Sequence, residues 1–441
     1  MTRAFVAAAL LAWSAGADAQ STPPGPMVEG PIAEGGAMYP GVRPLAPGSA
    51  PEDFGYVTEE YFVSGTANGL AYKTRILVRR PQPAERFSGI AVSEPMHSNG
   101  FAVTFEAARK SILMRGHVHL EIAAQQSNLA TLKSFNPVRY ASLSIPSGGQ
   151  TSEIIAQLGR LVKGNLSGGP LAPLAVRRLI LEGTSQASMV LRTYQEQKHF
   201  QERMPDGGAI VDGYLAISTL GRTKMMIVDV PTVHMPTMTE VNSGGAVAGA
   251  PFERDDGDDP GNRYRLYEVA GMAHANSRDP VSFAPNPCTL PVSDFPWGAM
   301  VAMGLSHLID WVDKGIVPPH AQRLQFDNNT ANDGSRLALD ENGNVKGGVR
   351  STYVDVPVAQ YGVPNAGATQ AANFNCSIAG WRVAYDAETL LELYRTQGAY
   401  ISRLNRRLME LMREGWMLPE YAEEVRADAQ QVEIPSPAKT R

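Results

Sequence analysis

The sequence predicts an α/β protein with a doubly wound, mostly parallel β-sheet and a C-terminal elaboration. Short apolar runs alternate with helix-forming patterns along most of the chain, as in proteins whose parallel strands are linked by helices. The chain has 441 residues, of which 43% are hydrophobic, so it can bury a large core. One apolar run also leads through a tight turn, with a serine at its apex, into helix-forming residues. Together these three observations predict the fold class.

The first 54 residues precede the predicted core. Residues 1–19 contain a basic residue, an apolar run and a small-x-small ending, which predicts a signal peptide cut before Gln20. An uncleaved membrane anchor is the alternative, although the run is shorter than the roughly 18 to 20 residues that a span needs. Residues 20–54 are rich in Pro, Gly, Ala and Ser, which predicts an extended lead-in that does not order itself. We therefore expect a secreted or periplasmic protein without a membrane span.

The predicted core spans residues 55–320 and carries the alternating elements. Strands are expected at residues 56–63, 72–78, 87–92, 117–124, 177–183, 209–218, 232–239 and 263–269. Helices are expected at residues 101–114, 151–163, 189–197 and 295–314. The C-terminal elaboration is expected to span residues 321–441, with a hairpin turn at 340–343 and helices at 387–413 and 420–432. Functional side chains should lie at the carboxyl ends of the parallel strands.

The turn Gly183-Thr184-Ser185-Gln186-Ala187 predicts a nucleophile. A small residue before the serine lets the hydroxyl stand clear of the backbone. Serine is also favoured as a helix N-cap, but capping does not explain a glycine at the end of an apolar strand. We therefore interpret Ser185 as the nucleophile of an α/β-hydrolase.

A nucleophilic serine needs a base and an acid, which follow it in the order acid, then histidine, in this fold. Glu240 and His274 each come after a predicted strand, so they can converge with Ser185 at one edge of the sheet. The remaining histidines are expected to be packing or surface residues. Three aspartates near strand ends are alternatives for the acid, namely Asp206, Asp212 and Asp229.

An oxyanion hole is expected beside the nucleophile. In this fold one backbone N–H comes from the residue after the serine and another from the loop after the third strand. These donors would be Gln186 and either Met96 or His97. The segment 94–100 could equally be a structural turn around Pro95.

The two cysteines, Cys288 and Cys376, predict a disulfide, because an even pair in an exported chain is commonly bridged. Closing so long a loop stabilises the folded state by about 4 kcal/mol in a chain-entropy model. We expect the bridge to fasten the later part of the chain to the core without a part in catalysis.

Charge and motifs exclude several classes of function. The formal net charge of −5, without a basic stripe, argues against nucleic acid as a partner. Residues 253–259 are strongly acidic but lack the ligand spacing of a calcium loop, so a solvated loop is favoured over a calcium site. No zinc spacing and no phosphate loop occur, so we expect neither a metal nor another cofactor.

With these motifs the chain resembles a known family, the exported bacterial "alpha/beta hydrolase domain-containing" proteins, which are distant relatives of carboxylesterases. The motifs that carry the resemblance lie at residues 117–125, 183–186, 271–274, 347–350 and 354–359 and in the tail helices. The resemblance implies an α/β-hydrolase fold with Ser185 as nucleophile, Glu240 as acid and His274 as base. Ala187 departs from the family pattern, in which a glycine or serine is common.

The expected function is hydrolysis of carboxylic esters, small or polymeric, through an acyl-enzyme. Two alternatives remain at this point. The same residues could hydrolyse an amide or peptide, and the fold could be a catalytically inactive scaffold used for binding.

Overall fold

The computed structural model describes residues 25–164, 169–172, 174–219, 224–244, 254–278, 285–327 and 336–435. The predicted signal peptide, residues 1–19, lies outside these residues. Among the helices of the described residues, none is long and apolar enough to cross a membrane.

A nine-stranded sheet forms the centre of the protein, with the strand order β1-β2-β3-β5-β4-β6-β7-β8-β9. The strands are β1 Met27–Glu29, β2 Tyr56–Ala67, β3 Leu70–Pro81, β4 Ile90–Pro95, β5 Val118–Ile122, β6 Arg178–Thr184, β7 Gly213–Ile217, β8 Thr232–Met235 and β9 Tyr264–Leu266. The strands from β5 to β9 in this order are parallel, and β1, β2 and β3 form an antiparallel edge. The predicted mostly parallel sheet is therefore confirmed.

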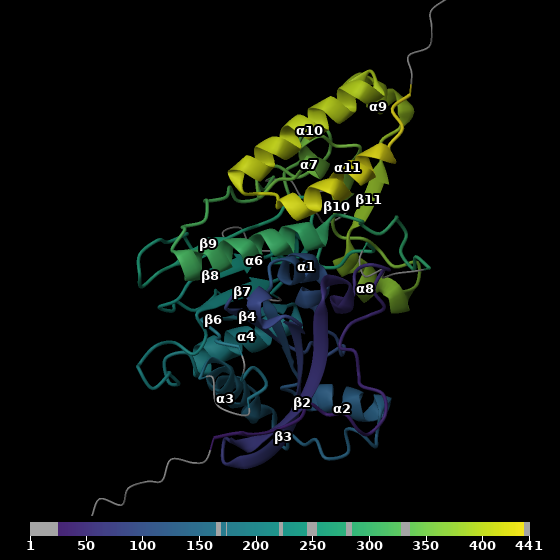
Figure 1. Ribbon diagram of the computed structural model, residues 1–441. Helices are drawn as coiled ribbons and strands as arrows, with labels where there is room; N and C mark the ends of the chain where they lie inside the picture. Colours follow the sequence, from purple (N-terminus) through teal and green to yellow (C-terminus); the bar gives the residue numbers. More distant parts are fainter. Residues whose placement is uncertain are drawn as a thin grey trace, which may run out of the picture.

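Helices cover both faces of this sheet (Figure 1). The helices of this part of the chain are α1 Val103–Met114, α2 Gln126–Phe135, α3 Thr151–Lys163, α4 Gln186–Gln197, α5 Met238–Gly244 and α6 Trp297–Lys314, of which α1, α3, α4 and α6 pack on the sheet. Successive side chains of a strand point to opposite faces. On β4, Glu94 contacts the first turn of α1, whereas the neighbouring Ser93 lines a small cavity together with residues of α3. Helices α1 and α3 therefore lie on opposite faces of the sheet. The sheet is thus wound on both sides.

Helix α2 was not predicted, because its sequence is mostly polar. Only Leu129 and Leu132 supply an apolar face, and both are buried. The side chain of Asn128, in the first turn, accepts a hydrogen bond from the N–H of the N-cap residue Gln125 at 3.1 Å, as in a capping box. Local capping together with two leucines is a weaker signal than the periodicity of the other helices.

The lead-in differs from its prediction over the described part, residues 25–54. Its chain is extended, but side chains of the core hold it in place. The guanidinium of Arg139 donates to the carbonyls of Ile32, Glu34 and Gly36 at 2.7 to 2.9 Å. Polar contacts to the core therefore contribute to the order of this segment, together with the packing of Tyr39 in the apolar core.

The C-terminal elaboration gathers on the side of α6, away from α2 and α3 (Figure 1). Its elements are α7 Thr352–Asp355, β10 Ala359–Gly362, α8 Asn373–Ala379, β11 Trp381–Ala384, α9 Ala387–Tyr394, α10 Gln397–Glu414 and α11 Ala422–Gln430. One predicted helix, residues 387–413, is in fact two. Arg395 has a φ of +62°, and Thr396 caps the second helix by accepting the N–H of Ala399.

The predicted disulfide joins Cys288 to Cys376, 88 residues apart in the sequence. The predicted hairpin turn at 340–343 is confirmed, because Leu339 pairs with Val345 and Gly343 has a φ of +79°. The division of the chain at residue 321 stays a prediction.

Candidate active site

Ser185 lies at the sharp turn between β6 and α4. Its backbone has φ 55° and ψ −119°, a conformation that non-glycine residues rarely adopt. Such backbone strain is concentrated at functional sites. Ser185 occupies the N-cap position of α4, yet its side chain caps no amide of the helix. The N-cap alternative therefore does not account for its hydroxyl.

Gly183 makes this turn possible. A Cβ atom at Gly183 would lie 2.7 Å from the backbone carbon and oxygen of Ala187 and 2.8 Å from the amide nitrogen of Ser188. These contacts are with backbone atoms, which cannot rotate away. The tight approach is thus at Gly183, while Ala187 is buried within α4 and the turn accommodates its methyl group.

His274 connects the serine to Glu240. Its Nε2 lies 2.9 Å from Oγ of Ser185, and its Nδ1 lies 2.5 Å from Oε1 of Glu240. A neutral imidazole with its proton on Nδ1 donates to the carboxylate and leaves Nε2 to accept the serine proton. Ser185 is 9% exposed and Glu240 is 3% exposed, and the side chain of His274 is 8% exposed. The contacts among these three residues are therefore largely shielded from water.

The second oxygen of Glu240 is held by Thr237. The N–H and the hydroxyl of Thr237 donate to Oε2 at 2.8 and 2.7 Å. These bonds orient the carboxylate, whose other oxygen faces His274. Glu240 lies in the first turn of α5 rather than at the end of a strand, because β8 stops at Met235.

The three alternative acids have other partners. Asp212 pairs with Lys163 at 2.8 Å, and Asp229 pairs with both His199 and Arg203. Asp206 accepts the N–H of Gly208 at 2.9 Å. Glu240 is the acid that faces His274.

The loop between β4 and α1 does not offer the predicted backbone donors. The N–H of Met96 donates to the carbonyl of Ile122 at 2.8 Å, and the N–H of His97 donates to the carbonyl of Phe101 at 3.0 Å. Neither amide is available to an oxyanion in this conformation. In this respect residues 94–100 behave as the structural turn that the sequence offered as an alternative.

The side chain of His97 offers a different donor. Its Nδ1 accepts the N–H of Asn99 at 3.0 Å, so the proton of the neutral ring is on Nε2. Burial and repulsion from His274 lower the pKa of His97, which keeps the ring neutral near pH 7. The sequence contained no signal for this tautomer, because it depends on the folded loop.

Gln186 reaches the same loop with its side chain. Its Oε1 accepts the N–H of Ser98 at 3.1 Å, and its Nε2 donates to Oε1 of Gln125 at 2.7 Å. Its backbone N–H belongs to the first turn of α4, where amides lack partners within the helix and the helix dipole favours negative charge. This amide remains the first candidate for an oxyanion donor.

Three buried titratable side chains near the turn were not predicted as a cluster. Glu94, His119 and Glu182 are fully buried on neighbouring strands, and their ligand atoms lie within 4.8 Å of one another. Burial raises the pKa of Glu94 to about 8, and burial together with Glu94 raises the pKa of Glu182 well above its usual range. Among the described residues, neither oxygen of Glu182 has a hydrogen-bond partner. Both carboxyl groups therefore favour a proton.

The cluster has the residue types of a metal site, but one contact argues against that use. Arg79 lies 3.1 Å from Nδ1 of His119 and can only donate, so the ring carries its proton on Nε2, the atom that faces the two carboxyl groups. A metal-bound histidine normally donates its other N–H to an acceptor. The donor set thus fits a buried proton better than a metal ion.

The described part of the acidic loop, residues 254–259, is paired with basic side chains. Asp256 contacts Arg323 at 3.0 Å and His320 at 2.9 Å, and Asp258 contacts Arg265 at 2.5 Å. These ion pairs engage two of the four aspartates in this segment, Asp256 and Asp258.

A comparison with models of known protein families agrees with this fold. A family model described as "Alpha/beta hydrolase domain" matches residues 28–427. None of the curated proteins matches the chain.

Solved structures of esterases are similar at low identity. Two fungal esterases from Rhizomucor miehei are represented by a structure with 10% identity and a TM-score of 0.33, over 58% of this chain and 85% of that one. Esterase Est22 has 10% identity and a TM-score of 0.29, over 42% of this chain and 66% of Est22. Brefeldin A esterase, a bacterial homologue of human hormone sensitive lipase, has 12% identity and a TM-score of 0.27, over 40% and 43%. The chain thus spans less than two thirds of the length of Est22 and of brefeldin A esterase.

Proposed function

Because the chain belongs to the alpha/beta hydrolase domain family, with a model match over residues 28–427, we propose that it is a serine-dependent hydrolase of carboxylic esters. One observation carries the proposal. Ser185, His274 and Glu240 form a continuous chain of contacts of 2.9 and 2.5 Å at a strained strand-to-helix turn. This is the arrangement that activates a serine for acyl transfer.

In the proposed reaction, Oγ of Ser185 forms a bond to the acyl carbon while Nε2 of His274 takes the hydroxyl proton. The tetrahedral intermediate then expels the alcohol, which receives that proton from His274, and leaves an acyl-serine. Water repeats the sequence, with His274 again as base, and releases the carboxylic acid. Glu240 holds the imidazole in the required tautomer and stabilises its protonated form.

Two donors are proposed for the oxyanion. One is the backbone N–H of Gln186, at the N-terminus of α4. The other is the Nε2–H of His97, in place of the backbone amides of Met96 and His97, which are bonded elsewhere. A single such donor contributes about 10² to 10³ in rate.

Labelling with a fluorophosphonate tests the proposal directly. The wild-type protein should be labelled and should hydrolyse p-nitrophenyl esters. Ser185→Ala should not be labelled and should lose on the order of 10⁶ in kcat, because the nucleophile is absent. Equal labelling of both proteins would refute the assignment.

The alternative of amide or peptide hydrolysis uses the same residues and differs in protonation of the leaving group. Parallel assays with p-nitrophenyl esters and p-nitroanilides of the same acyl group separate the two. The inactive-scaffold alternative predicts no turnover of either. We also propose that the protein works outside the cytoplasm, a location that the Cys288–Cys376 bridge favours.

A further inference from the structure

Helix α8 ends against the first turn of α5, which carries the proposed acid, and against the loop that carries the proposed base. The last carbonyl groups of a helix have no partner within the helix. In α8, the carbonyl of Ile378 accepts the N–H of Ala275 at 3.1 Å and the hydroxyl of Thr239 at 3.5 Å. Ala275 follows His274 and Thr239 precedes Glu240. A single carbonyl therefore bonds the neighbours of both residues.

The hydroxyl of Thr239 extends this contact to the backbone of His274. The N–H of His274 donates to Oγ1 of Thr239 at 3.1 Å, and the same hydroxyl donates to the carbonyl of Ile378. A hydroxyl can accept one bond while it donates another. The backbone of the proposed base is thus joined to α8 through one side chain.

Gly380, directly after α8, packs against the residue that precedes His274. It has a φ of +63°, and a Cβ atom there would lie 2.7 Å from Cβ of Ala273 and 2.9 Å from the carbonyl oxygen of Gly362. At such distances one of the groups must move. The close packing of α8 on the histidine loop therefore requires glycine at this position.

Little apolar packing holds α8 in place. Cys376 and Ala379 of α8 form a small buried cluster with Cys288 and Val292, separate from the main core. The side chain of Phe374, also on α8, is 71% exposed. The disulfide to Cys288 is thus a principal attachment of this helix.

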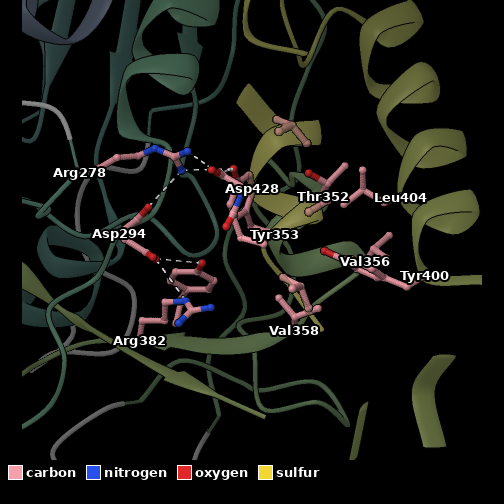
Figure 2. Close-up of a pocket in the computed structure, with 15 residues that line it drawn as sticks. Arg278, Asp294, Thr352, Tyr353, Val356, Val358, Arg382, Tyr400, Leu404 and Asp428 are labelled. Atoms are coloured by element: carbon pink, nitrogen blue, oxygen red, sulfur yellow. Dashed lines mark hydrogen bonds and ion pairs between the residues drawn. The ribbon is translucent and has the colours of Figure 1, made fainter. Parts of the chain in front are cut away.

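The C-terminal elaboration contacts the same loop a second time. Arg278, four residues after His274, pairs with Asp428 of α11 and donates to the hydroxyl of Tyr353 at 3.2 Å. Figure 2 shows these three side chains converging in the wall of a cavity of about 380 Å³. The elaboration therefore holds the histidine loop at two points, Ala275 and Arg278.

We propose that α8 positions His274 and Glu240 for the reaction and that the Cys288–Cys376 disulfide holds α8 there. This inference rests on the proposed function, since it assigns these residues a role in the same site. The disulfide, expected to have no part in catalysis, would act on it indirectly through Ile378 and Gly380. None of these positioning residues needs to touch the substrate.

Gly380→Ala tests the packing, with Gly315→Ala as its matched control. Both glycines have a positive φ, but the space around Gly315 is open within 4 Å. Displacing a catalytic group by about 1 Å costs about 10²-fold in rate. We expect Gly380→Ala to lower kcat by about 10- to 100-fold on p-nitrophenyl esters at unchanged KM, with active sites counted by fluorophosphonate. Gly315→Ala should keep the wild-type kcat.

Three further variants separate positioning from general stability. Thr239→Val should lower kcat by about 10-fold and shift the acid limb of the pH profile of kcat/KM, because His274 loses a backbone contact, and Thr239→Ser should restore both. Replacing both cysteines by serine should lower kcat per labelled site in the same way. The NMR signal of the His274 Nδ1 proton should move in each impaired variant.

The outcomes distinguish the two proposals. A wild-type protein that no fluorophosphonate labels refutes the proposed function itself. The positioning role is refuted by a different result, in which fluorophosphonate labels the wild type but Thr239→Val and the cysteine-free protein behave normally. Both would then show the wild-type kcat per labelled site, the wild-type pH profile and an unmoved Nδ1 proton signal. If Gly380→Ala does not fold, the pair Thr239→Val and Thr239→Ser decides.

Discussion

Substituting Gly183 by alanine should damage the site with little effect on the rest of the protein. Ordinary contacts of a Cβ atom begin near 3.4 Å, whereas the new methyl group would lie 2.7 Å from the backbone of Ala187. The start of α4 must therefore move by about 0.7 Å, the difference between these distances, and it carries Ser185 with it. A displacement of about 1 Å costs about 10²-fold in rate. We expect a loss of about 10- to 100-fold in kcat.

The assay is ester hydrolysis per folded molecule, accompanied by the rate of fluorophosphonate labelling and by thermal unfolding. Gly148→Ala is the control, because a Cβ atom at Gly148 would meet nothing within 4 Å. Labelling should slow in parallel with kcat in Gly183→Ala and stay normal in Gly148→Ala. Wild-type kcat in a folded Gly183→Ala protein would refute the claim that this glycine sets the position of the serine.

Two further predictions concern buried charge. The pKa of Glu182 is raised in the folded state, so the native protein keeps a proton that the unfolded chain releases above about pH 4.5. As the pH rises above this value, the contribution of Glu182 to the free energy of unfolding therefore falls by up to about 1.4 kcal/mol per pH unit. In urea unfolding, the stability of Glu182→Gln relative to wild type should therefore increase as the pH is raised from 5 to 8. Parallel plots of the free energy of unfolding against pH for the two proteins would contradict this. Arg75 is fully buried between Glu60 and Glu121, so Arg75→Met should lose about 3 to 5 kcal/mol. Arg80→Met, whose partner Glu59 is partly exposed, should lose less than about 1 kcal/mol, and a similar loss in both variants would oppose the argument.

The sequence was sufficient to predict eight of the nine strands of the sheet, all but β1, and the three residues of the proposed triad. Strand–helix alternation and the order Ser185, Glu240, His274 are properties of the linear chain, and the observed contacts join those three residues. The proposed second oxyanion donor could not be predicted from the sequence, because it depends on which amides of the folded loop are already bonded. The N–H of Met96, for example, donates to the carbonyl of Ile122 on the neighbouring strand β5. Similarly, no local pattern indicated that Arg139 would order the lead-in.

The strained turn at Ser185 is supported by residues that no local motif contains. The N–H of Ser185 donates to the carbonyl of Ile217 at 2.9 Å, which ties the turn to β7. The hydroxyl of Thr184 lies 3.0 Å from that of Thr104, and Glu94 accepts the N–H of Thr104 at 2.8 Å. A strained conformation persists only where its surroundings determine it from several sides. The short Gly-x-Ser pattern is therefore a weak signal by itself, since β7, α1 and the buried Glu94 hold the serine in its conformation.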